Sequence, residues 1–197
     1  MVVPENSYQP QNRADWRDWL TEHHNQTEGV WLIRFKKSAG KPYLKETDAI
    51  EEALCFGWID SLPRKLDEER TMLYFSPRKP GSNWSALNKQ RAKQLIETGM
   101  MMSAGMVKIE QAKADGSWNA LDSVEALEIP PDLVAAFSRY PNSEENFHAF
   151  PRSTKRGILE WILNAKRPTT RAKRIEKTAR LAAENIRANQ WHPKKKD

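Results

Sequence analysis

Two short stretches of the chain concentrate residue types that can bind a ligand. Residues 55–61 read CFGWIDS, and residues 75–85 read FSPRKPGSNWS. Cationic side chains, hydroxyl groups and the N–H groups at the start of a helix can bind an anion, and indole rings can stack on a planar molecule. The pattern therefore predicts a site for an anionic or planar ligand, formed by Trp58, Asp60, Arg78, Lys79, Ser82 and Trp84.

Each member of this predicted site has a role in binding and an alternative role in the fold. For binding, Arg78 supplies the charge, while Ser82 and the N–H groups after it bind oxygen atoms. Trp58 or Trp84 forms the wall of the site. As structural residues, the tryptophans pack in the core, Asp60 closes a turn or pairs with Arg78, and Ser82 caps the following helix. The residue types are compatible with both roles.

Established catalytic patterns are absent: the sequence has no Gly-rich phosphate loop, no HExxH and no GxSxG. Cys55, the single cysteine, lies in an apolar run, which indicates a core position. Asp48, Glu51 and Glu52 are predicted to share one exposed helical turn, where nothing holds a proton between them. We therefore predict a non-enzymatic protein without a metal or other cofactor. An enzyme that uses Asp60 is an alternative.

Length and composition indicate a globular protein with a substantial core. The chain has 197 residues, enough for one ordinary domain or two small ones, and eight tryptophans supply large side chains to bury. No stretch approaches the roughly 18 apolar residues of a membrane span. The start, MVVPENSYQP, has no charged segment followed by an apolar run, so we expect a cytoplasmic protein.

Positive charge is concentrated at the C-terminal end. From Arg152 onward there are 14 Lys or Arg and 4 Asp or Glu, a formal charge of +10, against −4 for the rest of the chain. Arg167, Arg171 and Arg174 can present a basic side that binds nucleic acid or another anion. The alternative is a solvated helix face, followed by a basic tail, residues 191–197, that we expect to be disordered.

The N-terminal half reads as a small α+β unit over residues 12–78. Tryptophan and leucine at helical spacing predict a helix over residues 13–22, and Thr47 or Asp48 can begin a second helix that ends at Gly57. Strands are predicted over residues 30–37, from residue 58 toward 65, and over residues 70–76.

After Ser76 the pattern becomes helical, and residues 82–190 read as a helical region. Ser82 or Asn83 can cap a helix that runs from about Trp84 to Glu97. Further helices are predicted to begin near residues 103, 133, 143, 153 and 169. The predicted fold class is α+β: a small N-terminal sheet with helices, followed by an all-helical C-terminal half.

Three segments carry a resemblance to a known family: EEALCFGWIDS at residues 51–61, FSPRKPGSNWS at residues 75–85 and WILNAKRPTTRAKRIEK at residues 161–177. In order and spacing they resemble the YdeI/OmpD-associated family, also called bacteriocin-protection proteins, from about Trp16 to Ile186. The resemblance implies a bacterial, cytoplasmic stress-response protein linked to tolerance of bacteriocins or cationic antimicrobial peptides. It implies no established enzymatic activity.

Together, the resemblance and the residues predict a stress-tolerance protein with a binding site at the junction of its two halves. Its partner is an anionic or planar small molecule, or another protein. A nucleic-acid-associated protein that uses the basic C-terminal helices is an alternative.

Overall fold

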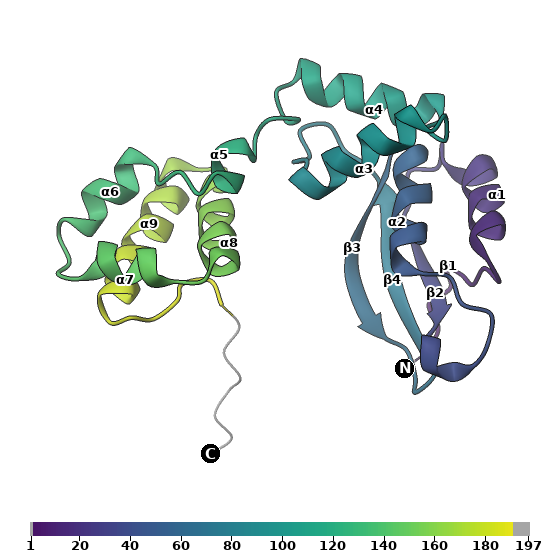
Figure 1. The fold of residues 1–197 in the computed structure, drawn as a ribbon, viewed down its shortest axis with the longest axis horizontal. Coiled ribbons are helices and arrows are strands. Elements are labelled where there is room, and N and C mark those ends of the chain that lie inside the picture. Colours follow the sequence, from purple (N-terminus) through teal and green to yellow (C-terminus); the bar gives the residue numbers. More distant parts are fainter. Residues whose placement is uncertain (1, 191–197) are drawn as a thin grey trace. The chain divides into compact units, whose positions relative to one another are not determined.

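In the computed structural model, which describes residues 2–190, the chain forms two compact units, one up to Ala120 and one from Leu121 on. The first unit contains a four-stranded sheet and helices, and the described part of the second is helical (Figure 1). The predicted fold class is therefore confirmed. We expected the division near residue 80. The predicted basic tail, residues 191–197, lies outside the described residues.

The sheet has the strand order β1-β2-β4-β3, formed by β1 (Ser7–Tyr8), β2 (Val30–Phe35), β4 (Arg70–Pro77) and β3 (Trp58–Lys65). β1 runs parallel to β2, and the other neighbours are antiparallel. The register of β3 against β4 shifts between Asp60 and Pro63. The pattern predicted the three longer strands. It missed β1, because two residues carry no periodic signal.

Successive side chains along each strand point to opposite faces of the sheet, and both faces carry apolar residues. Leu32 and Phe75 belong to the main core together with residues of α1 (Arg13–His23) and α2 (Glu46–Cys55). Trp31, one position before Leu32, and Met72, three positions before Phe75, belong to a smaller cluster of their own on the other face. This period of two is the strand pattern that the sequence predicted.

A tight turn at Gly57 connects α2 to β3. Gly57 has a φ of 75°, a left-handed conformation that glycine adopts without steric cost, and its N–H donates to Leu54 O at 3.0 Å. A Cβ at this position would also lie 3.0 Å from the backbone oxygen of Ala104. The turn therefore places the first residues of β3 directly after the buried end of α2.

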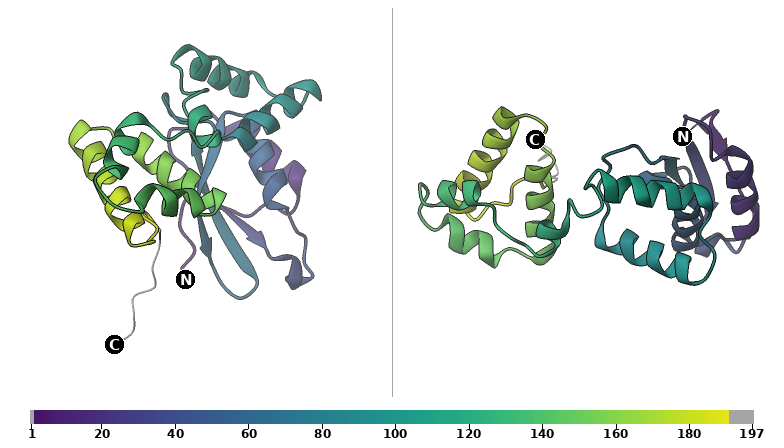
Figure 2. Two further views of the ribbon diagram at one scale, coloured as in Figure 1. Left: turned by 60° about the vertical axis from the view of Figure 1, so that its left-hand side comes forward. Right: turned by 90° about the horizontal axis from the view of Figure 1, so that it is seen from above.

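Helices α3 (Ala86–Glu97) and α4 (Ser103–Ala114) both pack against α2, which joins them to the first unit (Figure 2). The predicted cap of α3 was wrong. Ser85 is the cap: its backbone is extended, and its hydroxyl accepts from Asn88 N at 3.2 Å. Ser82 instead donates its hydroxyl to Lys79 O at 2.6 Å within a turn.

The second unit contains α5 (Asp122–Glu125), α6 (Pro131–Phe137), α7 (Ser143–Ala149), α8 (Arg152–Leu163) and α9 (Pro168–Ala183) around an apolar core of its own. The predicted helices are present, but α5 was not predicted. Pro168 is the first residue of α9, where its missing N–H costs little. A short 3-10 helix in the first unit, η1 (Lys37–Ala39), was also unpredicted.

In the described part of the chain, no helix is both long and apolar enough to cross a membrane.

Candidate functional site

Arg78 is a buried arginine at the end of β4. Its side chain is 3% exposed, and its backbone N–H donates to Gly57 O at 2.9 Å, which fixes the start of the loop that follows. The guanidinium carbon lies 3.8 Å from the centre of the Trp84 ring, and Nη1 donates to Asn83 O at 3.0 Å. Stacking and this one hydrogen bond hold the group in place.

The other edge of the Arg78 guanidinium has no acceptor. Within the described residues, neither Nε nor Nη2 has a hydrogen-bond partner, although both atoms are buried. This edge is the fork with which arginine binds a carboxylate through two parallel hydrogen bonds. Arg171 uses the same two nitrogens in this way, because its Nε and Nη2 donate to the Asp132 carboxylate at 2.7 and 3.0 Å.

The charge of Arg78 also lacks a close counter-ion. Burial lowers the pKa of Arg78 to about 10, and the negative charge of Asp60 offsets only part of this effect. Among the described residues, no carboxylate oxygen lies within 4.0 Å of the group. By contrast Arg34, which is 6% exposed, pairs with Glu46 at 2.7 Å.

Arg78 lines a small hollow that a loop covers. The space measures about 10 Å³, which is about the room that one water molecule needs. The covering loop, residues 79–82, is tied to the end of α4, because Gly81 N donates to Asp115 Oδ2 at 2.9 Å. Other residues of the loop and of α4 line the hollow too: Lys79, Pro80, Ser82, Lys108, Gln111 and Ala112. An anion larger than water enters only if this loop moves.

Trp84 adds another unpaired donor at the hollow. The side chain is 1% exposed, and in the described part of the chain its Nε1–H has no acceptor. Trp84 and Arg78 thus contribute donors and a positive charge. A buried donor without an acceptor costs free energy, so a ligand that supplies acceptor atoms is favoured here. The chemistry of the hollow suits an oxyanion.

The other residues of the predicted site lie in different surroundings. Trp58 is core: it is 1% exposed, and its Nε1 donates to His24 O at 3.0 Å. Asp60 is half-buried on β3, and Lys79 is exposed on the covering loop. Ser82 is half-buried in the same loop. The structure therefore brings four predicted residues to one hollow: Arg78, Lys79, Ser82 and Trp84. Trp58 and Asp60 are not part of its lining.

Sequence analysis missed the contribution of α4. Lys108, Gln111 and Asp115 line the hollow from this helix and its C-terminal end. Their spacing of three and four residues places them on one helical face, so a signal was present. It indicates a shared face, but nothing in it connects that face to a loop some 30 residues earlier in the chain.

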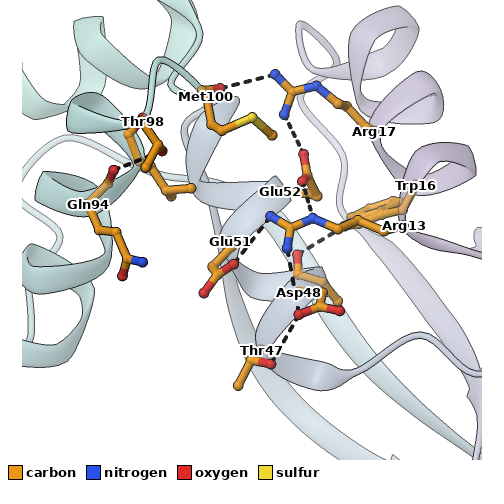
Figure 3. A network of polar contacts seen from close by, with 12 residues as sticks. Arg13, Trp16, Arg17, Thr47, Asp48, Glu51, Glu52, Gln94, Thr98 and Met100 are labelled. Atoms are coloured by element: carbon orange, nitrogen blue, oxygen red, sulfur yellow. Dashed lines mark hydrogen bonds and ion pairs between the residues drawn. The ribbon is translucent and has the colours of Figure 1, made fainter.

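The acidic cluster of α2 differs from our prediction. Glu52, which we predicted to be exposed, is buried, with 1% of its surface exposed. It accepts hydrogen bonds from Arg13 Nε at 2.5 Å and from Arg17 Nη1 at 2.6 Å (Figure 3). Arg13 also contacts Glu51 at 3.2 Å and Asp48 at 3.6 Å. The arginines come from α1, which the sequence of α2 does not reveal. Since these charges are paired, the cluster joins α1 to α2.

Cys55 is the core residue that the sequence predicted. It is fully buried, and burial, with a contribution from the charge of Glu52, raises the pKa of its thiol to about 11. The thiol is therefore protonated at neutral pH. Across the described residues, no group of histidine, cysteine or carboxylate side chains has a metal-binding arrangement.

The basic C-terminal residues of the alternative prediction are largely engaged within the second unit. Arg171 forms the bidentate pair with Asp132. Arg174 donates to Trp161 O, and its guanidinium lies 4.9 Å from the Trp161 ring centre. Arg167 is exposed. Because two of the three arginines have internal partners, they are poorly placed to act as free phosphate-binding groups.

Two known families match the chain, and each match falls within one of its two compact units. Residues 8–108, about half of the chain, match a family described as a domain of unknown function (DUF8412). Residues 126–185 match the family described as Bacteriocin-protection, YdeI or OmpD-Associated. The chain belongs to the DUF8412 family and carries a YdeI/OmpD-associated domain. No curated protein and no solved structure matched the chain significantly.

The suspected family is thus confirmed, but its match is shorter than the resemblance suggested. WILNAKRPTTRAKRIEK, residues 161–177, lies within the YdeI/OmpD-associated domain. The motifs at residues 51–61 and 75–85 lie within the DUF8412 domain. The Arg78 hollow therefore belongs to the DUF8412 domain, apart from the α4 residues after position 108.

Proposed function

We propose that the protein is a non-enzymatic oxyanion-binding protein of the cytoplasm that acts in bacteriocin protection. The binding site is the hollow beside Arg78, and the ligand is a carboxylate or a phosphate. The role in tolerance follows from the description of the YdeI/OmpD-associated domain, and it is part of the proposal.

One observation carries the proposal: among residues 2–190, the Nε and Nη2 fork of the buried Arg78 has no acceptor. Burying a charge without a partner is costly, and natural proteins avoid it unless the group has a use. The same fork holds a carboxylate at Arg171, so the fork is suited to two oxygen atoms of one carboxylate or phosphate. The loop at residues 79–82 would open to admit a ligand and close over it.

Titration with simple anions tests the binding step. We expect acetate or phosphate to shift the Nε–H resonance of Arg78 in a saturable way in nitrogen-edited NMR spectra. In Arg78→Met, the backbone amide resonances of the loop at residues 79–82 should no longer respond to the anion, whereas in Arg187→Met, which removes the same charge from an exposed position, they should. A saturable response to acetate but not to phosphate would identify the ligand as a carboxylate. If neither anion shifts the Arg78 resonance, the binding proposal is wrong.

The role in tolerance needs a separate experiment. A deletion strain that carries the Arg78→Met gene should remain sensitive to a bacteriocin, whereas the wild-type gene and the Arg187→Met gene should restore tolerance. Full tolerance with Arg78→Met, at normal protein level, would separate the role in tolerance from the anion site. Failure of the wild-type gene would contradict the role in tolerance itself.

A further inference from the structure

The Arg78 hollow carries more positive charge than one arginine supplies. Lys79 of the covering loop and Lys108 of α4 line it as well. Among residues 2–190, neither lysine forms an ion pair or a side-chain hydrogen bond. Asp115 is the one acidic residue in the lining, so three positive groups and one negative group give the hollow a formal charge of +2. A ligand with two negative charges would balance it.

The carboxylate of Asp115 is engaged by backbone N–H groups. Its Oδ2 accepts from Gly81 N and its Oδ1 from Ser117 N, both at 2.9 Å. The Ser117 side chain and these N–H groups lower the pKa of Asp115, so the group is ionised at neutral pH. Asp115 thus ties the loop to the end of α4, and in the described part of the chain it forms no ion pair with the cations of the hollow.

The unpaired N–H donors of the hollow lie at two levels. The Arg78 guanidinium carbon lies over the Trp84 ring, 3.8 Å from its centre, so the Nε and Nη2 fork is above the plane that contains the indole N–H. A carboxylate that binds the fork is coplanar with it and directs both oxygens toward it. A phosphate group has three terminal oxygens that do not share a plane with its phosphorus. Two of them can accept from the fork while the third accepts from the indole N–H.

From the unpaired cations and the two levels of donors we infer that the ligand of the Arg78 hollow is a phosphate dianion, either free or as the terminal group of a phosphomonoester. This inference rests on the proposed function and narrows its ligand from an oxyanion to a phosphate. The Arg78 fork binds two oxygens and Trp84 binds the third. Lys79 and Lys108 balance the second charge. Because Lys79 belongs to the covering loop, its attraction to the phosphate favours closure of the loop over the ligand.

Calorimetric titration of the full chain at pH 7.5 compares four anions: inorganic phosphate, methyl phosphate, dimethyl phosphate and acetate. At this pH methyl phosphate is mostly a dianion, because its second pKa is about 6. Dimethyl phosphate is tetrahedral but carries one charge. We expect phosphate or methyl phosphate to bind at least about tenfold more tightly than dimethyl phosphate and acetate. Binding of inorganic phosphate alone would identify the free ion as the ligand, and binding of methyl phosphate would identify an esterified phosphate.

Two variants test the groups that distinguish a phosphate from a carboxylate. Lys108→Gln removes one charge, and Trp84→Phe removes the indole N–H but keeps an aromatic ring under Arg78. Each should weaken phosphate binding by about fivefold to tenfold and change acetate binding by less than about twofold. Lys37→Gln, an exposed change on η1, should leave both affinities within about twofold. Thermal unfolding shows whether each variant is folded.

The outcomes separate this inference from the proposed function. If acetate binds as tightly as phosphate and Arg78→Met removes both, the inference is wrong and the proposed function stands. Equal affinities for methyl phosphate and dimethyl phosphate would also overturn the inference, because the second charge would then have no role. So would folded Lys108→Gln and Trp84→Phe variants with wild-type affinity for phosphate. If none of the four anions binds, the proposed function fails together with the inference.

Discussion

Arg78 and Arg34 are both buried arginines, yet their charges have different surroundings. Arg34 has a carboxylate at 2.7 Å, whereas Arg78 has an indole ring, one carbonyl oxygen and the more distant charge of Asp60. A buried arginine whose charge is paired with a carboxylate supports the fold, even though Arg34 Nε has no acceptor among the described residues. An arginine without an acid partner reduces stability, which is the behaviour expected of a group kept for binding.

This difference predicts that Arg78→Met does not destabilise the protein. At pH 7 the lowered pKa corresponds to a cost of about 3 kcal/mol for holding the charge, partly offset by stacking on Trp84. We expect a free energy of unfolding, measured in urea without added oxyanions, equal to or above that of the wild type. A loss of more than about 2 kcal/mol would mean that Arg78 is mainly structural.

The pH dependence gives a second check on Arg78. A folded-state pKa of about 10, below the ordinary value of 12.5, means that the unfolded chain binds more protons between these values. Stability from this group therefore rises with pH in that window. Relative to Arg78→Met, the wild type should gain about 1 kcal/mol in free energy of unfolding between pH 8 and pH 10.5. If the difference in free energy of unfolding between the wild type and Arg78→Met does not change over this pH range, the lowered pKa of Arg78 is contradicted.

Glu52 is the opposite case, a buried acid with full pairing. Glu52→Gln removes the charge that faces Arg13 and Arg17, and we expect a loss of about 2 kcal/mol, because both arginines are partly exposed and water screens part of the effect. Glu51→Gln, at a more exposed position of α2, should change stability by less than about 0.5 kcal/mol. Urea unfolding of both variants at pH 7 compares them.

At the scale of elements, the close approach of α4 to α2 depends on Gly105. A Cβ on Gly105 would lie 2.4 Å from the backbone oxygen of Cys55 and 2.8 Å from that of Leu54. Backbone atoms cannot move aside as a flexible side chain can. The contact therefore sets where α4 lies, and with it the α4 side chains that line the Arg78 hollow.

Two glycine-to-alanine changes test this packing. Gly105→Ala should lower the free energy of unfolding by about 2 kcal/mol or more, since α4 must shift. Gly157→Ala in α8, where a Cβ would have no atom within 4 Å, should raise it by about 0.5 to 1 kcal/mol through helix propensity. Thermal unfolding of the pair measures both effects. Equal effects of the two changes would show that the α2–α4 contact is not tight.

At the scale of the molecule, each unit has its own core and its own family match. The match at residues 8–108 falls in the first unit, and the match at residues 126–185 falls in the second. The end of α4 and the segment through residue 125 belong to neither match. Asp115, which lines the Arg78 hollow, lies in this segment.

Separate cores predict separate local stabilities. Ile158→Ala removes a fully buried side chain from the core of the second unit. We expect faster amide hydrogen exchange in residues 121–190 and unchanged exchange in residues 2–120. Mass spectrometry after timed exchange measures the two regions in one sample. Faster exchange in both would show that the units unfold together.

The sequence by itself determined most of the secondary structure, the fold class and the suspected family. Periodicity is a local property, so the alternation in β4 and the apolar stripes of the helices were sufficient. It also predicted that Arg78 and Trp84 lie close together, because only five residues separate them, and both line one hollow. Elements of two residues, such as β1, have too little pattern to be predicted.

Tertiary structure alone decided which groups are paired. Glu52 is buried because the arginines of α1 reach it across 35 and 39 residues of chain. Arg78 has no carboxylate beside it within residues 2–190, because the carboxylates of that part of the chain lie elsewhere, and Asp60 acts only from a greater distance. Trp58 and Trp84 have the same residue type, yet in the part of the chain that the structure describes only Trp58 has an acceptor for its indole N–H. Such differences depend on distances between segments far apart in the chain, and no local pattern encodes them.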